Sequence, residues 1–521
     1  MVYCGYTDIL MVVIFITVLM LLIVFGLLFF LFLSNFEILV ISVKLFSSRF
    51  FRDIEIIVTV WNLLFLLIVL IIRRRVAIFS FSYINRIIVR NFILLYLSFV
   101  FRMVWLIINN NFYWIILGWD GLGVVSFLLI IFYINHERIN NGIYTMFQNR
   151  VGDLFFVLFI VGILDLRIGR NLILKYGLIV LVIGACVKRA QYPFNSWLLA
   201  AIRAPTPISS LVHSSTLVVA GVYVLLQFSY CLIDVLEVLK YLRVLTLVVR
   251  RIGLLIEFDM KKLIAYSTLR HVSLIMLMLR LKLFKVVYFH LNIHAIFKST
   301  MFMCFGFVIL ASYHRQDKRL VSLNRLNPLI KIMYYFSCLC LIGLPFLRGF
   351  FSKDFIIEKF IEVNNEFYLV VLLLMFLGIR VYYGVKLLNL INVYFPYRIV
   401  EKRYLGVMRV VCMILIMVFI INVYIRLMVS LSLEILSFKI MIYLFIVVFF
   451  LIRVLTNMNY KFNIYDKVKN MKEVWVLDVY RLDKFIYWNM SLVIVYLNQL
   501  TNIKLFLLMN WWVLVFVVVI F

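Results

Sequence analysis

The segment HLNIHAIFKS, residues 290–299, carries two imidazoles and an ammonium inside an otherwise apolar run. His290, His294 and Lys298 are each four residues apart, so a helix would place them in one stripe roughly 12 Å long. An imidazole can donate at one ring nitrogen and accept at the other, so a file of histidines and water can pass protons. The HLNIH spacing also suits a zinc pair, but no HExxH motif or nearby carboxylate supports metal binding. The stripe therefore predicts a proton path.

Further titratable residues also lie within apolar runs. A charge at the bilayer centre is costly, so such groups usually face the protein interior, pair with one another or line a proton route. Burial favours the neutral amine of a lysine and a nearby carboxylate favours the ammonium, so movement of that carboxylate can load or unload a proton. These residues are Asp120 in GWDGLG, Lys188, His213, and Lys353 with Asp354.

Three of these residues also have a simpler explanation. Asp120 could cap the start of a helix through its neighbouring glycines. Lys188 and Arg189 could be a snorkelling pair at the end of a span. His213 could satisfy one local hydrogen bond in the core. The three explanations remain open from the sequence, and each places its residue differently in the fold.

The composition indicates a membrane protein with many spans. The chain has 521 residues, of which 66% are hydrophobic and 14% charged, and its mean hydropathy is +1.12. Apolar runs such as IEIIVTVWNLLFLLIVLII and ISSLVHSSTLVVAGVYVLL are long enough to cross the hydrocarbon core as helices. We expect an all-α polytopic membrane protein with about 14 to 16 transmembrane helices.

Charge and cysteine content exclude several classes of function. The formal charge is +29, but the basic residues mostly punctuate the spans, where they meet lipid headgroups, and no basic stripe with exposed aromatics indicates nucleic-acid binding. The seven cysteines form no C-x-x-C pair and are expected to be buried small apolar residues. No signature for flavin, haem or an iron–sulfur cluster is present. The chain is therefore expected to move charge without redox chemistry of its own.

Two prolines interrupt apolar, helix-like sequence. Pro193 lies in VKRAQYPFNSWLL, and Pro345 lies in LCLIGLPFLRGFFSKDF. A proline removes a backbone hydrogen bond, which is tolerated at membrane depth only where protein or a water-filled cavity covers the freed groups. Two broken helices, each with a lysine nearby, are the pattern of an ion path.

Several stretches together resemble the antiporter-like membrane subunits of respiratory complex I, the NADH:ubiquinone oxidoreductase. They cover roughly residues 85 to 390, in the order GWDGLGVVSFLLI, NRVGD, KRAQYPFNSWLLAAIRAPTPISSLVHSSTLVVAGVYVL, DMKKLIAYST, HLNIHAIFKSTMF and GLPFLRGFFSKD. The resemblance implies two inverted five-helix repeats, each with a broken helix, and a proton path along the membrane midplane.

The same resemblance implies a role for each titratable residue. Asp120 falls where the family places a glutamate, and Lys188 falls on the lysine that pairs with it. The other expected relay residues are the connecting histidines His213, His290 and His294, then Lys298, and on the exit side Lys353 with Asp354. The aspartate at 120 is one methylene shorter than glutamate. Four residues depart from the family pattern: Arg189, Ala200, Arg203 and Arg270. The three arginines among them add positive charge near the expected relay.

The expected organisation has four parts. Residues 1–84 form N-terminal transmembrane helices, 85–395 form the antiporter-like proton-translocating core, and 396–453 form further transmembrane helices. Residues 454–521 form a polar connector, a lateral amphipathic helix and a final anchoring span. Between 478 and 504 the polar residues recur at spacings of three, four or seven, which places them on one face of such a helix.

The expected function is proton translocation in the membrane arm of complex I, driven by NADH:quinone electron transfer in other subunits. No cofactor is expected in this chain, and NADH, FMN, iron–sulfur clusters and quinone belong to those other subunits. The expected partners are neighbouring antiporter-like subunits and membrane lipids, with no nucleic acid. The excess of Phe, Tyr, Leu, Ile and Val suits an AT-rich organellar gene and hence the mitochondrial inner membrane. Alternatives are a cation/proton antiporter subunit of a non-redox complex and a mainly structural subunit with an impaired relay.

Overall fold

The computed structural model describes residues 4–34, 38–43, 54–84, 88–164, 170–214, 216–229, 259–312 and 328–343, with single positions that include Ser352 and Lys353. All of them belong to the first of the two units into which the chain divides, Met1–Arg453. Asp354, Pro345, the expected spans 396–453 and the expected lateral helix and anchor lie outside the described residues.

The N-terminal part combines two helices with a short β-ribbon. Helix α1 spans Cys4–Ser34 and α2 spans Val60–Tyr83, and the antiparallel strands β1 (Ile38–Val43) and β2 (Ile54–Thr59) lie between them. This ribbon is a local departure from the all-α expectation within the mostly helical described part, because Ile, Val and Thr crowd β2 and fit a pleated strand. The Thr59 side chain then accepts a hydrogen bond from the Asn62 N–H and caps α2.

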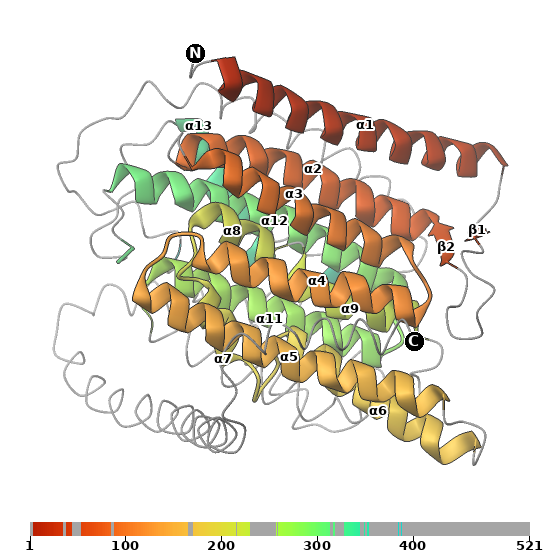
Figure 1. Ribbon diagram of the computed structural model, residues 1–521. Coiled ribbons are helices and arrows are strands. Elements are labelled where there is room, and N and C mark those ends of the chain that lie inside the picture. The colour runs from red at the N-terminus through yellow and green to blue at the C-terminus, as the bar shows by residue number, and fades with distance from the viewer. Residues whose placement is uncertain are drawn as a thin grey trace, which may run out of the picture. The chain divides into compact units, whose positions relative to one another are not determined.

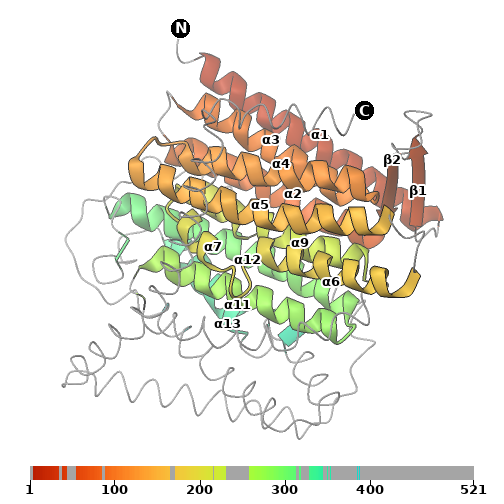
Figure 2. The same ribbon diagram turned by 60° about the horizontal axis from the view of Figure 1, so that its bottom comes forward.

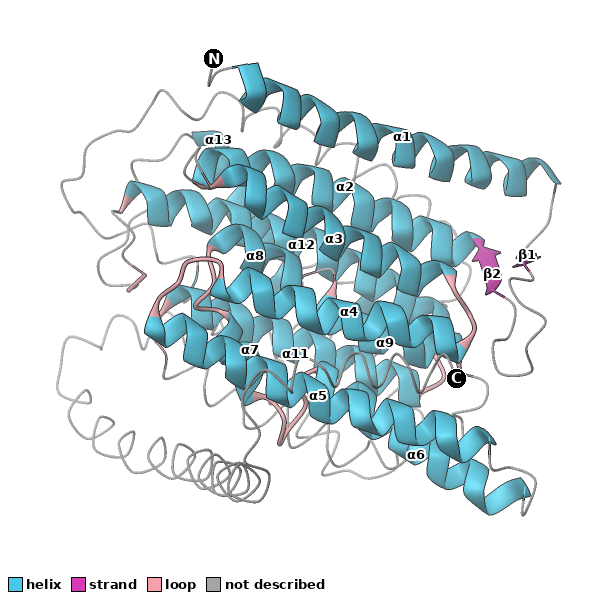
Figure 3. Cartoon of the chain, viewed as in Figure 1, coloured by secondary structure: helices cyan, strands magenta, loops and turns pink. Residues whose placement is uncertain are grey.

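The remaining described elements are helices, as Figure 3 shows. In chain order they are α3 (Val89–Ile108), α4 (Phe112–Ile131), α5 (His136–Leu164), α6 (Arg170–Lys188), α7 (Ser196–Ala201), α8 (Thr206–Val212), α9 (Leu217–Gln227), α11 (Met260–Arg280), α12 (Phe284–Ala311) and α13 (Pro328–Ile342).

The long helices lie side by side with roughly aligned axes (Figure 1), and the turned view shows the same arrangement (Figure 2). Among the described residues, five segments are long and apolar enough to cross a membrane: α3, α4, the pair α8–α9, α11 and α12. Burial differs sharply between them. Within an apolar stretch of 18 residues, 39% of the residues are buried in α3, against 94% in α12 and all of them in α8–α9. The polar stripe of α12 therefore lies inside the protein and not against lipid.

Two helix breaks interrupt this bundle. The expected break at Pro193 is confirmed, because α6 ends at Lys188 and helix resumes only at Ser196. The run ISSLVHSSTLVVAGVYVLL was expected to be one continuous span, and the structure divides it into α8 and α9 at His213–Thr216. No proline marks this second break. Its Ser and Thr side chains instead bond to backbone carbonyls, as Thr216 Oγ1 does to the Leu211 carbonyl at 2.8 Å.

Candidate functional site

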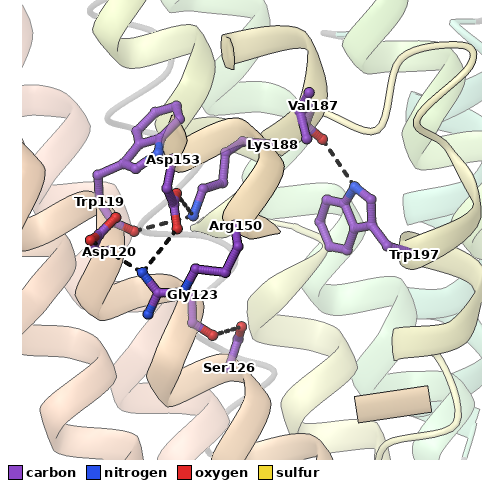
Figure 4. Close-up of polar contacts among 9 residues, drawn as sticks. All are labelled: Trp119, Asp120, Gly123, Ser126, Arg150, Asp153, Val187, Lys188 and Trp197. Carbon is purple, nitrogen blue, oxygen red and sulfur yellow. Dashed lines mark hydrogen bonds and ion pairs between the residues drawn. The ribbon is translucent and has the colours of Figure 1, made fainter. Parts of the chain in front are cut away.

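A buried ion pair joins α5 to the end of α6. The Lys188 ammonium lies 2.9 Å from an Asp153 carboxylate oxygen, and the two side chains are only 2% and 8% exposed. Lys188 Nζ also donates to the Trp119 carbonyl at 3.3 Å and lies 5.2 Å from the centre of the Trp119 ring (Figure 4). Lys188 is therefore an interior ammonium with a carboxylate partner, and the snorkelling explanation does not apply.

Arg150 extends this pair to Asp120. Its guanidinium lies 3.3 Å from an Asp120 oxygen and 3.4 Å from an Asp153 oxygen, and so bridges the two carboxylates (Figure 4). Two acids and two bases make the cluster formally neutral. Asp120 sits in the middle of the continuous helix α4, so it does not cap a helix start.

The structure gives Lys188 a partner that the sequence did not assign. The resemblance implied a pair between Asp120 and Lys188, and both belong to this cluster, but the ion pair that Lys188 makes is with Asp153. Asp120 joins the cluster through its ion pair with Arg150. The short aspartate side chain is consistent with this outcome, because it reaches one methylene less far than the glutamate that the resemblance implied. NRVGD was noted in the sequence as a motif, but its acid was not assigned a role.

Glycines bring these side chains together. An ideal Cβ on Gly152 would lie 3.2 Å from Val187 Cβ, and one on Gly184 would lie 3.1 Å from the Gly152 carbonyl oxygen. Small residues at a helix crossing let the two backbones approach closely. Asp153 follows Gly152, and Lys188 is one turn beyond Gly184, so this crossing places the acid against the base. On α4, an ideal Cβ at Gly123 would lie 3.2 Å from Lys188 Nζ, so the glycine leaves room for the ammonium.

The break after Lys188 is held by hydrogen bonds to the end of α6. Trp197 Nε1 donates to the Val187 carbonyl at 3.0 Å, and the Gln191 N–H donates to the Cys186 carbonyl at 3.0 Å. The carbonyls that the break would otherwise leave open at membrane depth are thus satisfied within the protein. Lys188 is fixed at a helix end inside the bundle.

The histidine stripe of α12 is buried and meets a histidine of α11. His271 Nδ1 lies 3.4 Å from His290 Nε2, and the His271 and His294 rings are 5.4 Å apart between centres. His290 Nδ1 lies 2.8 Å from Ser352 Oγ. His271 thus lies between the two predicted histidines. The sequence offered one overlooked signal, since Ser267 and His271 are four residues apart on one face of α11.

Both predicted distal lysines are also buried, and each donates to a nearby oxygen. Lys298 Nζ donates to Ser267 Oγ and lies 3.5 Å from the Ile264 carbonyl. Lys353 Nζ donates to the Leu341 carbonyl at the end of α13. Gly343 follows that helix with φ at +75°, a backbone region that favours glycine, and an ideal Cβ there would lie 3.4 Å from Lys353 Nζ.

His213 stands apart from both groups. It is fully buried at the break after α8, and neither ring nitrogen has a hydrogen-bond partner among the described residues. Its ring centre lies 6.0 Å from that of Phe302 on α12. The structure therefore does not support the explanation that one local hydrogen bond accounts for His213. Within the described part, Lys188 and His213 bond to no histidine of α12.

The three arginines that depart from the family pattern do not all lie beside the predicted relay residues. Arg270 Nη2 lies 3.4 Å from His271 Nε2, so it does add charge to the histidine group. Arg203 is half exposed and pairs with Glu137 at 3.1 Å, away from the relay residues. Arg189 is fully buried against α9.

Comparison with known proteins gives consistent matches. The family described as NADH:quinone oxidoreductase/Mrp antiporter, TM matches residues 109–378. NADH-ubiquinone oxidoreductase chain 5 of Anopheles arabiensis is 41% identical over 311 residues, covering 57% of this chain and 81% of the relative. The same subunit of Aedes aegypti is 40% identical over 341 residues, covering 63% of this chain and 59% of the relative. That of Locusta migratoria is 40% identical over 311 residues, covering 57% and 54%. Against the last two, the chain spans less than two thirds of the relative's length.

Two solved structures share the fold. A chain of an archaeal membrane-bound sulfane sulfur reductase superimposes with a TM-score of 0.70 at 19% identity, covering 80% of this chain and 90% of that chain. A chain of the Mrp complex from Dietzia sp. DQ12-45-1b superimposes with a TM-score of 0.69 at 19% identity, covering 93% of this chain and 60% of that chain. These likenesses place the chain among polytopic, antiporter-like membrane folds.

Proposed function

Because the chain belongs to the NADH:quinone oxidoreductase/Mrp antiporter transmembrane family, we propose that it is a proton-translocating membrane-arm subunit of respiratory complex I in the mitochondrial inner membrane. The observation that carries the proposal is the buried Lys188–Asp153 ion pair at a helix break, in the same interior as a file of three histidines and Lys298. No redox step is assigned to this chain. NADH, FMN, iron–sulfur clusters and quinone act in other subunits of the assembly.

The Lys188 pair acts as a proton store. While Asp153 lies against Lys188, its carboxylate compensates the buried ammonium for the lost hydration. Withdrawal of Asp153 leaves a buried ammonium without a counter-charge, so the proton passes to the next acceptor and a neutral amine remains. The neighbouring Arg150 is a second partner of Asp153 in the same cluster, so the carboxylate can shift from Lys188 toward Arg150.

The histidine file carries the proton further. His290 contacts Ser352 through one ring nitrogen and His271 through the other, which is the pattern of a relay member that accepts on one side and donates on the other. Arg270 accepts no proton and lies against His271 Nε2, so His271 exchanges protons through Nδ1, which faces His290, while its ring packs on that of His294. Lys298 lies one turn beyond His294 on α12 and is the next acceptor.

The outer side of the Lys188 cluster is the proposed contact with a neighbouring membrane subunit. Asp120 and Arg150 lie near the middle of α4 and α5, yet their side chains are 25% and 29% exposed. Lipid is a poor environment for such a pair, so a protein surface with polar groups is the favoured cover. An antiporter-like neighbour meets this need and would join its own proton path to this one.

The second candidate is a subunit of a cation/proton antiporter that works outside any redox complex. The Mrp-complex chain favours keeping this candidate, because its fold covers 93% of this chain. Purification of the native assembly separates the two. Co-purification of NADH-oxidising subunits that carry FMN and iron–sulfur clusters supports the complex I assignment. An assembly that exchanges monovalent cations for protons, with no NADH oxidation, overturns it.

A further inference from the structure

Arg189 is a buried cation that the proposed relay does not use. Its relative exposure is 0%, and all three guanidinium nitrogens are buried without a hydrogen-bond partner among the described residues. Lys188, its neighbour in sequence, has three oxygen or ring partners in the α4–α5 cluster. The two side chains leave the end of α6 in different directions, so Arg189 shares none of those partners.

The arginine side chain packs against α9. An ideal Cβ on Gly221 would lie 3.1 Å from the Ala185 carbonyl oxygen and 3.2 Å from both Cγ and Nε of Arg189. The glycine therefore leaves space on α9 where any larger residue would meet the arginine. Every residue of α9 up to Leu226 is buried, so neither lipid headgroups nor bulk water reach this place directly.

A guanidinium buried in this way needs a negative charge or hydrogen-bond acceptors nearby to offset its lost hydration. Lysine and histidine can lose a proton when buried, whereas arginine stays charged. A buried charge without a partner is among the most costly features a fold can contain. In the described interior the buried carboxylate is Asp153, and it is already engaged by Lys188 and Arg150.

The start of α9 adds a second positive feature. Gly221 is the fifth residue of α9, so Arg189 lies only about 6 Å along the helix axis from its first residue. The N–H groups of Val219 and Ala220 already donate to the Thr216 carbonyl, and the positive end of the helix dipole remains at this start. Guanidinium and helix start therefore both favour negative charge in this part of the interior.

We propose that a small monovalent inorganic anion of the chloride class binds at Arg189 between α6 and α9. One guanidinium neutralises one unit of negative charge, so a monovalent ion leaves the site neutral while a phosphate or sulfate would not. The anion completes the hydrogen bonding of the buried arginine and is a structural ligand, independent of whether Lys188 translocates protons.

The test is chloride binding to the purified intact assembly. Equilibrium dialysis with radioactive chloride compares the wild type with Arg189→Met, in which an apolar side chain of similar length removes the charge. Arg203→Met is the matched control, because it removes an exposed arginine that pairs with Glu137. The expected result is one chloride fewer per assembly in Arg189→Met and no change in Arg203→Met. Equal binding in all three overturns the proposal and leaves water or a carboxylate of this chain as the partner.

A second measurement needs only the wild type, so the proposal stays testable if Arg189→Met does not assemble. Exchange of chloride for gluconate at constant ionic strength should lower the unfolding temperature, because a ligand that binds only the folded state stabilises it by mass action. Bromide should restore the temperature, since it has the same charge and a similar size. An unfolding temperature that is the same in chloride and gluconate contradicts a bound anion.

Discussion

Replacement of Asp153 with asparagine tests the assignment of the Lys188 partner. At an effective dielectric constant of about 20, unit charges 2.9 Å apart attract by roughly 6 kcal/mol before desolvation is counted. Removing one member of a buried ion pair typically costs about 3–5 kcal/mol. Without Asp153, Lys188 loses the carboxylate that compensates its buried charge and that the proposed transfer step withdraws. Translocation per electron should therefore fall steeply.

Asp120→Asn is the matched comparison. Asp120 is a quarter exposed and contacts the cluster through Arg150, so its loss should perturb Lys188 much less than loss of Asp153. The assay reconstitutes the intact assembly in liposomes and measures protons moved per NADH oxidised for both variants. Normal stoichiometry in Asp153→Asn, together with a strong loss in Asp120→Asn, would refute the reasoning and restore Asp120 as the functional partner.

Three further predictions concern the interior. Lys298→Met should lower protons per electron with little effect on assembly yield, and unchanged pumping would make the α12 stripe structural. His271→Phe should slow transfer through the histidine file, whereas His136→Phe, at the exposed start of α5, should not; equal rates in both variants would remove His271 from the path. Gly123→Ala should lower the unfolding temperature, because the added methyl group crowds Lys188 at a cost of about 1–3 kcal/mol. Gly162→Ala should not lower it, since no atom lies within 4 Å of its ideal Cβ. Equal unfolding temperatures in the two variants would contradict the packing argument.

The features that repeat at helical spacing were predictable from the sequence. The stripe of His290, His294 and Lys298 followed from spacing alone, and the break after Lys188 followed from the chemistry of Pro193. Both depend on interactions within one segment, which periodicity and backbone rules describe well. Four of the cysteines, Cys186, Cys304, Cys338 and Cys340, are buried, as the sequence predicted.

The features that depend on how two helices cross were not predictable. Asp153 became the partner of Lys188 because Gly152 and Gly184 set the distance between α5 and α6, and His271 contacts the histidine stripe because α11 lies against α12. The Asp153 contact leaves no signal in the spacing of one segment, and the four-residue spacing of Ser267 and His271 does not show which helix they face. The break at His213 was also missed, since serine and threonine side chains replace backbone partners there without a proline.

The central claim is that Lys188 carries protons through this chain, and its most direct test is the number of protons moved per electron in assemblies that carry Lys188→Met. Lys262→Met is the control, because Lys262 is 38% exposed and pairs with Asp259 at 3.1 Å outside the cluster. We predict that Lys188→Met assembles and oxidises NADH but moves fewer protons per electron, while Lys262→Met matches the wild type. A wild-type ratio in Lys188→Met would contradict the account.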